Sequence, residues 1–405
     1  MQIRATRARF VAKGSFGAAR RHMALRFDHE RRVADAPLSV VLFTERLDAT
    51  YYAYFHYALH SLADDRRVSF HVMDSGTVMR HWGGPSLLAA RICRRVAPHV
   101  VVFNRYALPD GAELARQFRR RGRVVLYHID DDLLAIPAEL GTDVSAHHGD
   151  PRISREREAV LAEADVVQPS THHLAERLRA RLPSTKVIEP SHPPYPHALL
   201  EAADMPGGPA ASPIIGYMAS KSHGGDLELV LPAIVSIMER RPEARFEMFG
   251  TLTMPDELER RFPGRVQRHH AVNDYREFLR RLAGFRWSVG LAPLLPTAFN
   301  ACKSAIKYLE YTAAGIPTVA SPGPAYTVIE SGTNGLLADS PERWAACIGQ
   351  LLDDREYATS LVSEAHRDCE SLFGFGAAKL RLVSVFARLS AGRESELHAG
   401  WRPRS

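Results

Sequence analysis

The chain has 405 residues, of which 45% are hydrophobic and 24% are charged, a composition typical of folded globular domains. A chain of this length is expected to form two domains, each with a buried core of its own. The four cysteines (Cys93, Cys302, Cys347 and Cys369) are too scattered for a disulfide framework or a metal knuckle, which indicates a reducing cytoplasm. No stretch reaches the roughly 18 apolar residues that a membrane-spanning helix needs.

The formal net charge of +6 is concentrated at the N-terminus. Residues 1–36 contain nine Lys or Arg and three acidic residues, and this surplus of six equals that of the whole chain, 52 basic minus 46 acidic. We therefore expect a basic arm over residues 1–36. Two interpretations stay open: peripheral contact with anionic lipid at the inner face of the membrane, or a disordered or mis-started N-terminus. A nucleic-acid partner is not expected, because no recognition motif accompanies the charge.

After the arm, short apolar runs alternate with helical segments, which is typical of βαβ units and a parallel sheet. A first α/β domain is expected over residues 37–190. Its predicted strands are 39–43, 68–72, 99–103, 123–129 and 165–168, and its helices include 51–63, 86–96 and 111–121.

Proline and glycine accumulate next, which predicts an interdomain linker over residues 191–212. A second α/β domain is expected over residues 213–372, followed by a C-terminal helix and tail over 373–405. Two similar halves around one linker enclose a cleft, the usual place for a small-molecule site. The strands predicted in the second domain are 214–218, 245–249, 266–268, 287–292 and 317–321.

The second domain opens with a strand that runs into a turn of small and polar residues before a helix. This arrangement directs backbone N–H groups and a helix dipole toward a phosphate. Gly216 and Ser220 belong to this segment, Lys221 adds a positive charge, and Ser220 or Ser222 adds a hydroxyl group. The turn is therefore a candidate phosphate site.

The segment from Phe299 to Pro317 is predicted to form one helix with two different faces. Lys303, Lys307 and Glu310 line one face at i, i+4 and i+7. These three residues are either a solvated Lys–Glu ladder or, near a sheet edge, part of a ligand site. The opposite face is apolar and consists of Cys302, Ala305, Ile306, Leu309 and Ala313.

Four motifs lie close together in the second domain: 290–294 (GLAPL), Asn300 to Glu310, 313–321 (AAGIPTVAS) and 330–337 (ESGTNGLL). With these motifs, residues 286–340 resemble the C-terminal half of the group 1 glycosyltransferases of the GT-B type, which have two Rossmann-like domains facing a cleft. The resemblance covers about residues 212–370 and implies the α/β GT-B fold. It also implies that a closing helix, over residues 377–389, packs back across the domains.

The resemblance also implies roles for individual residues. In this family the glutamate five residues before the glycine of an Ala-x-Gly-x-Pro turn binds the donor ribose, which corresponds to Glu310. A second glutamate, eight residues earlier, contacts the donor sugar, but this chain has Cys302 there. The basic residue that holds the donor diphosphate corresponds to Lys221. The polar residues that could replace the missing glutamate are Asn300, Lys303 and Ser304.

The function implied by the resemblance is transfer of a hexose-type sugar from a nucleotide-diphosphate donor to a hydroxyl group of a glycan, lipid-linked or protein acceptor. It implies retention of the anomeric configuration without a cofactor or metal, because Lys221, Lys303 and Lys307 could neutralise the leaving diphosphate. Two alternatives stay open: a non-catalytic GT-B subunit that binds sugar nucleotide or serves as a scaffold, and a nucleotide-sugar epimerase of the same fold.

Three consecutive carboxylates, Asp130, Asp131 and Asp132, end a strand of the first domain. Crowded carboxylates are costly unless they are solvated, hydrogen-bonded or neutralised by a cation. Three interpretations stay open. Asp130 or Asp132 binds acceptor hydroxyl groups with His128 as a base, or the triplet binds Mg²⁺ or Mn²⁺, or the carboxylates complement a helix dipole.

The remaining polar clusters give weaker signals. Tyr51, Tyr52 and His56 either line an acceptor pocket or belong to the core. The adjacent histidines at 147–148, 172–173 and 269–270 are not expected to bind metal, because neighbouring side chains point apart and no Cys or carboxylate lies at ligand spacing.

Overall fold

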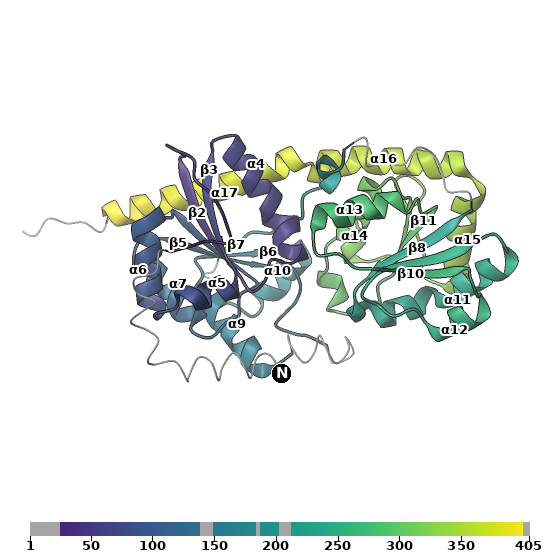
Figure 1. Cartoon of the computed structure of the whole chain (residues 1–405), viewed down its shortest axis with the longest axis horizontal. Helices are drawn as coiled ribbons and strands as arrows, with labels where there is room; N and C mark the ends of the chain where they lie inside the picture. Colours follow the sequence, from purple (N-terminus) through teal and green to yellow (C-terminus); the bar gives the residue numbers. More distant parts are fainter. Residues whose placement is uncertain (1–24, 138–148, 184–186, 202–211, 400–405) are drawn as a thin grey trace, which may run out of the picture.

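The computed structural model describes residues 25–137, 149–183, 187–201 and 212–399, and Figure 1 shows two α/β domains side by side. Residues 1–24 of the expected arm, residues 202–211 of the expected linker and the histidines at 147–148 lie outside the described residues. No helix in the described ranges is both long and apolar enough to cross a membrane.

The first domain is built on a seven-stranded sheet in the order β1-β3-β2-β4-β5-β6-β7. All neighbouring strands are parallel except β1, which pairs antiparallel with β3 at one edge. The strands are β1 His29–Arg31, β2 Leu38–Thr44, β3 Val68–Met73, β4 Val100–Asn104, β5 Val124–Ile129, β6 Val166–Pro169 and β7 Val187–Ile188. The helices are α3 Ala49–Tyr51, the π-helix η1 Tyr52–His56, α4 Tyr57–Asp64, α5 Ser75–His81, α6 Pro85–Val96, α7 Gly111–Arg119, α9 Pro151–Glu163 and α10 His172–Arg179.

Helices cover both faces of this sheet, which explains why β4 and β5 are buried along their whole length. In β2, Val41 and Phe43 pack toward α6, α7 and α9, whereas Val40 and Leu42 pack toward α4 on the opposite face. Alternate residues of one strand therefore enter two separate cores.

The second domain has a fully parallel six-stranded sheet in the order β10-β9-β8-β11-β12-β13. All the strands predicted from the sequence are present, with small shifts of their ends. The strands are β8 Ile214–Ala219, β9 Arg245–Gly250, β10 Val266–His270, β11 Val289–Ala292, β12 Thr318–Ala320 and β13 Leu336–Leu337. The helices are α11 Gly224–Arg240, α12 Asp256–Arg261, α13 Tyr275–Gly284, α14 Ile306–Ala313, α15 Pro341–Asp353 and α16 Arg355–Phe373, with short 3₁₀ turns η3 Pro196–Leu199, η5 Lys221–His223, η6 Asn300–Cys302 and η7 Pro324–Tyr326.

The prediction of one continuous helix over residues 299–317 is wrong. The segment forms η6, then an extended residue at Lys303 (φ −68°, ψ 150°), and then α14. The break has a tertiary cause, because the backbone carbonyl of Cys302 accepts a hydrogen bond from Thr171 Oγ1 of the first domain at 3.0 Å. In a continuous helix this carbonyl would bond to the N–H of residue 306.

The last helix, α17 (Phe375–Ala399), connects the second domain to the first, as expected. Figure 1 shows it in yellow, alongside the first domain. Leu382 and Phe386 are buried in the core beneath α4. Lys379 Nζ donates to Ser61 Oγ at 3.0 Å and lies 2.6 Å from Asp65 Oδ2. The C-terminal helix therefore fastens the two domains together.

Candidate active site

A cavity of about 410 Å³ lies between the two domains. Its walls come from segments at or after the carboxyl ends of β2, β4 and β5 in the first domain, and of β8, β9, β10 and β11 in the second. The carboxyl ends of parallel strands are where open α/β sheets bind ligands. Both sheets therefore present their ligand-binding edges to the same space.

The second-domain wall is formed by the broken helix segment. Lys303, Ser304, Lys307 and Glu310 all line the cavity. Lys307 is only 9% exposed, and its Nζ has no hydrogen-bond partner among the described residues, lying 5.1 Å from the centre of the Tyr217 ring. Burial lowers the Lys307 pKa to about 7, with Lys303 acting in the same direction, while Asp226 and Glu310 oppose the shift. This wall therefore holds a buried amine without a partner.

Glu310 is also buried, with 7% of its surface exposed. Burial raises the pKa of its carboxyl group to about 8, although a hydrogen bond with Tyr275 and the charge of Lys307 act in the opposite direction. Tyr275 lines the same cavity. In the ligand-free protein at neutral pH, Glu310 is thus largely protonated and can both donate and accept hydrogen bonds.

The first-domain wall is centred on Asp130. Thr50 Oγ1 donates to Asp130 Oδ2 at 2.6 Å, and Arg105 Nε lies 3.2 Å from Oδ1. Burial favours the neutral carboxyl group, but Arg105, His128 and Thr50 outweigh it, so the pKa of Asp130 is lowered. Arg105 is held at a left-handed backbone position (φ 51°), where its N–H donates to the carbonyl of His128 at 2.9 Å. Asp130 is therefore an ionised carboxylate at the cavity wall.

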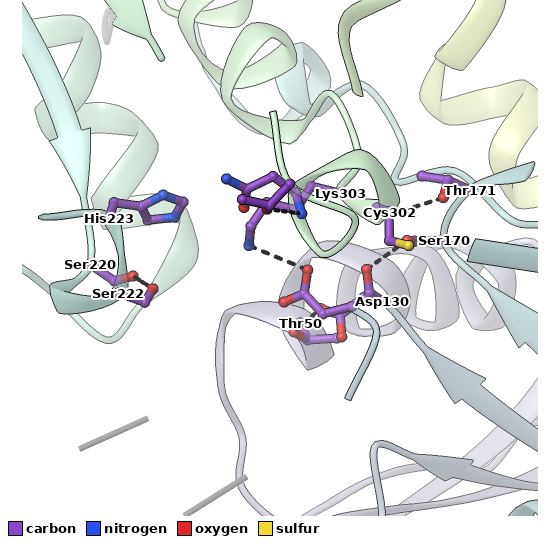
Figure 2. Close-up of polar contacts among 12 residues, drawn as sticks. Thr50, Asp130, Ser170, Thr171, Ser220, Ser222, His223, Cys302 and Lys303 are labelled. Carbon is purple, nitrogen blue, oxygen red and sulfur yellow. Dashed lines mark hydrogen bonds and ion pairs between the residues drawn. The ribbon is translucent and has the colours of Figure 1, made fainter. Parts of the chain in front are cut away.

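Lys303 links the two walls. Its Nζ lies 3.4 Å from Asp131 Oδ1 of the first domain and 5.0 Å from the centre of the Phe299 ring. Figure 2 shows Lys303 with His223 on the side of the second domain and Asp130 with Thr50 on the side of the first. The positive charge of Lys303 thus lies between the two domains.

Three predicted donor-site residues of the second domain do not line the cavity. Gly216 lies in β8, where an added Cβ would be 1.9 Å from the Trp287 ring, so this glycine allows close packing and does not approach a ligand. Lys221 is exposed on η5. Asn300 is buried and donates to Asp226 Oδ1 at 3.0 Å. Ser220, by contrast, does line the cavity.

In the first domain, Asp132 and His128 also lie away from the cavity lining. Asp132 is 1% exposed and its Oδ2 accepts from Arg177 Nε at 2.7 Å, which makes it the buried member of an ion pair with a partly exposed arginine. His128 is fully buried beside Asn104, with Nδ1 3.0 Å from Oδ1, and burial lowers its pKa to about 4. His128 therefore does not face a substrate as a base.

The three consecutive aspartates diverge. Asp130 faces Arg105, Asp131 faces Lys303, and Asp132 faces a third cation. A shared divalent-metal site would require these carboxylates to converge on one point. In the ranges that the structure covers, no group of three or more His, Cys, Asp or Glu side chains could hold a metal ion.

Cys302, at the position where the family resemblance implies a sugar-contacting glutamate, does not line the cavity. Its side chain packs with the core of the first domain, and Sγ lies 3.4 Å from the carbonyl of Ala298. Burial raises the pKa of the thiol to about 12, so it stays protonated. Figure 2 shows Cys302 directed toward Ser170 and Thr171. The neighbouring Lys303 and Ser304 line the cavity in its place.

Several residues that line the cavity were not predicted from the sequence. Tyr51, Tyr52 and His56 are absent from the lining, and the side chains that reach the cavity from this segment are Thr50 and Tyr54. Arg105 and Tyr275 carry no local sequence signal. His223 has a weak local signal, because Asp226 follows three positions later, in the first turn of a helix, where its carboxylate can hydrogen-bond to the histidine ring. The unpredicted residues are Thr50, Tyr54, Arg105, His223 and Tyr275.

Comparisons with known proteins find similar sequences and similar folds. The family model described as "Glycosyl transferases group 1" matches residues 212–354. A D-inositol 3-phosphate glycosyltransferase from Thermobispora bispora is 37% identical over 81 residues, which is 19% of this chain and 19% of that protein. The alignment with this curated relative thus spans only about a fifth of its length.

Solved structures match over both domains. Sucrose-phosphate synthase from Thermosynechococcus elongatus superimposes with a TM-score of 0.61 at 14% identity, covering 87% of this chain and 100% of that one. Anabaena HepE in complex with UDP-glucose has a TM-score of 0.61 at 13% identity, with the same coverage. At these identities the likeness shows the fold. The second domain therefore resembles the group 1 glycosyltransferases over residues 212–354, and both domains together have the GT-B fold.

Proposed function

We propose that this protein transfers a sugar from a nucleotide-diphosphate donor to an acceptor hydroxyl group. The observation that carries the proposal is the cavity itself, where Lys303, Lys307 and Glu310 face Asp130 across the two domains. The related HepE structures contain UDP and UDP-glucose, which supports a nucleotide sugar as the donor.

The donor would lie against the second domain. Glu310 offers hydrogen bonds to the hydroxyl groups of the ribose, the role implied by the family resemblance. Lys307 and Lys303 provide positive charge for the diphosphate, and a diphosphate would give the Lys307 amine the partner that it lacks. Negative charge grows on the leaving nucleoside diphosphate in the transition state, so fixed cations in a water-poor site lower the barrier.

The acceptor would lie against the first domain. Asp130 is ionised, and its carboxylate can accept a hydrogen bond from an acceptor hydroxyl group. Thr50 and Arg105 hold this carboxylate in place. We propose retention of configuration, with the acceptor proton passing to a phosphate oxygen of the leaving nucleotide. The acceptor class is a glycan, a lipid-linked sugar or a protein.

We further propose that the reaction needs no divalent metal. Two lysines already supply positive charge at the donor site, and each of the three consecutive aspartates faces its own cation. The test is transfer activity in EDTA, with activity after added Mg²⁺ or Mn²⁺ as the comparison. Activity that appears only with added metal would contradict this part of the proposal.

The first experiment measures binding of the nucleoside diphosphates of uridine, guanosine, adenosine and thymidine, in EDTA, by thermal denaturation. A ligand at 100 times its dissociation constant should raise the free energy of unfolding by about 2.7 kcal/mol. Glu310→Ala should remove the stabilisation, whereas Glu228→Ala, at an exposed site on α11 outside the cavity, should not. No stabilisation of the folded wild-type protein by any nucleotide would refute the proposed function.

The cysteine at position 302 supports a second candidate function. In this alternative, the protein is a GT-B subunit that binds sugar nucleotide without transferring the sugar. The cavity has no carboxylate from position 302 to contact the donor sugar. The two functions differ in one measurement, because an enzyme releases nucleoside diphosphate from its donor when the acceptor is present. Binding of the donor with no release across an acceptor panel would favour the binding subunit.

A further inference from the structure

His223 is a cavity residue that no motif of the sequence singled out for a role. It is the last residue of η5 and lies directly before α11. Its ring lines the cavity, with 12% of the side chain exposed. Figure 2 shows the ring directed toward the space that Lys303 also faces.

Asp226, in the first turn of α11, holds this ring. Asp226 is 4% exposed, and its Oδ2 lies 2.7 Å from His223 Nδ1. Its other oxygen, Oδ1, accepts from the N–H of Leu295 at 2.7 Å and from Asn300 Nδ2 at 3.0 Å. Hydrogen bonds with His223, Leu295 and Asn300 therefore hold the Asp226 carboxylate in place, and the bond to His223 orients the histidine ring.

The contact with Asp226 determines which ring nitrogen is left for a ligand. Because a carboxylate only accepts hydrogen bonds, His223 Nδ1 carries the proton of that bond. Nε2 is the remaining polar atom of the ring, and no residue in the described part of the chain bonds to it. Lys307, the buried amine without a partner, lines the same cavity and lowers the His223 pKa by its charge.

We propose that His223 binds the diphosphate of the donor through Nε2, and that Asp226 is the positioning residue that directs the ring into the cavity. This inference rests on the proposed function and assigns a further ligand to its donor site. It also gives the turn after β8 a phosphate contact through His223, since the Lys221 side chain does not line the cavity.

The charged groups around the ring predict a proton uptake on binding. His223 faces Asp226, Lys307 and Lys303, and burial with the two lysines lowers its pKa to about 4 against the pull of Asp226. The ring is therefore neutral in the ligand-free protein, and Nε2 has no proton to donate. A bound diphosphate counteracts the lysines and raises the pKa of the ring, which favours uptake of a proton from solvent and its donation in a hydrogen bond from Nε2 to a phosphate oxygen.

The test compares nucleoside diphosphate with the matching nucleoside by titration calorimetry on the full-length chain. In His223→Asn, the amide nitrogen takes the place of Nδ1 and keeps the bond to Asp226, but nothing replaces Nε2. In His223→Gln, an amide reaches the place of Nε2. His270→Gln is the matched control, at an exposed histidine of the same domain outside the cavity lining.

We expect His223→Asn to bind the diphosphate about 10- to 100-fold more weakly, the range for loss of one hydrogen bond to a charged group, with unchanged affinity for the nucleoside. His223→Gln should recover part of the loss, and His270→Gln should match the wild type. The wild type should also take up protons on binding the diphosphate, measured in buffers of different ionisation enthalpy, and His223→Asn should take up fewer.

The outcomes separate this inference from the proposed function. If the wild type binds nucleoside diphosphate and His223→Asn binds it equally well, His223 is not a ligand, although the proposed function stands. Equal losses for diphosphate and nucleoside, with a lower midpoint of thermal unfolding, would show a purely structural role and would also overturn the inference. If the wild type binds no nucleotide, the proposed function itself fails, and the inference fails with it.

Discussion

Lys303 of the second domain and Asp131 of the first face each other across the cavity, with Nζ and Oδ1 3.4 Å apart. Their side chains are 17% and 25% exposed. In the ligand-free protein the Asp131 carboxylate thus pairs with Lys303, the lysine that we expect to bind the donor diphosphate. An incoming phosphate must compete with Asp131 for Lys303 and is repelled by the carboxylate at the same time.

The first prediction concerns this pair. Lys303→Ala should weaken binding of nucleoside diphosphate by about tenfold, whereas Asp131→Asn should strengthen it by about two- to fivefold, the range expected from a partly exposed ion pair. Both effects can be checked by measuring the affinities for the diphosphate and for the nucleoside at low and high salt. The affinity for the nucleoside should be the same in both variants as in the wild type. A weaker affinity for the diphosphate in Asp131→Asn would contradict the proposed competition between Asp131 and the phosphate for Lys303.

The second prediction is that Lys307→Met stabilises the ligand-free protein while weakening binding of nucleoside diphosphate. Lys307 is a buried amine with no hydrogen-bond partner in the described part of the chain, and removing it should raise the free energy of unfolding at pH 6 by about 1–2 kcal/mol. Urea denaturation of the variant and the wild type checks the sign.

The same variant has a defined pH dependence. The Lys307 pKa is about 7 in the folded protein, below its ordinary value of 10.5, so the unfolded chain holds the proton between these pH values and the folded protein does not. The wild type therefore gains stability as the pH rises from 7 to 10 and loses it as the pH falls from 10 to 7, below which both states hold the proton and this contribution no longer changes. The advantage of Lys307→Met should be largest at pH 6 and shrink toward pH 10. An advantage that grows with pH would show that the amine is not desolvated.

The third prediction separates packing from ligand binding at Gly216. An added Cβ would lie 1.9 Å from the Trp287 ring, so Gly216→Ala should lower the free energy of unfolding by about 2–3 kcal/mol. Gly284→Ala is the matched control, because it adds a Cβ at an exposed position of α13 with no atom within 4 Å and should be neutral or slightly stabilising. Thermal or urea denaturation measures both. Full stability of Gly216→Ala together with loss of nucleotide binding would show instead that this glycine contacts the ligand.

The fourth prediction distinguishes two neighbouring aspartates. Asp132→Asn weakens the hydrogen bond between a buried carboxylate and Arg177 and should lower the free energy of unfolding by about 2–3 kcal/mol, with unchanged affinity for nucleoside diphosphate. Asp130→Asn should lower the rate of sugar transfer at least tenfold, because Asp130 lines the cavity on the side that we propose for the acceptor. Urea denaturation and transfer kinetics provide the two measurements. A lower rate of sugar transfer in Asp132→Asn, with an unchanged free energy of unfolding, would show that Asp132 acts in the active site after all.

The broken helix at residues 299–317 shows where local reasoning failed. The spacing of apolar and charged residues is helical throughout, and α14 follows it. The break at Lys303 depends on Thr171, which lies 131 positions away and bonds to the carbonyl of Cys302. No pattern within the segment contains that information, yet the break is what directs Lys303 into the cavity and Cys302 away from it.

The sequence by itself determined the two α/β domains, because alternating apolar runs and helical segments are local properties of the chain, and the predicted strands occur where expected. It also singled out Ser220, which follows a strand end, and Lys303, Lys307 and Glu310, which share one predicted helix face, while the family resemblance added Ser304. All five line the cavity. Tertiary structure alone decided which polar residues face the cavity and which are buried elsewhere. Asp130 and Asp132 differ by two positions, but only contacts with Arg105 and Arg177, on separate elements, direct one toward the cavity and the other away.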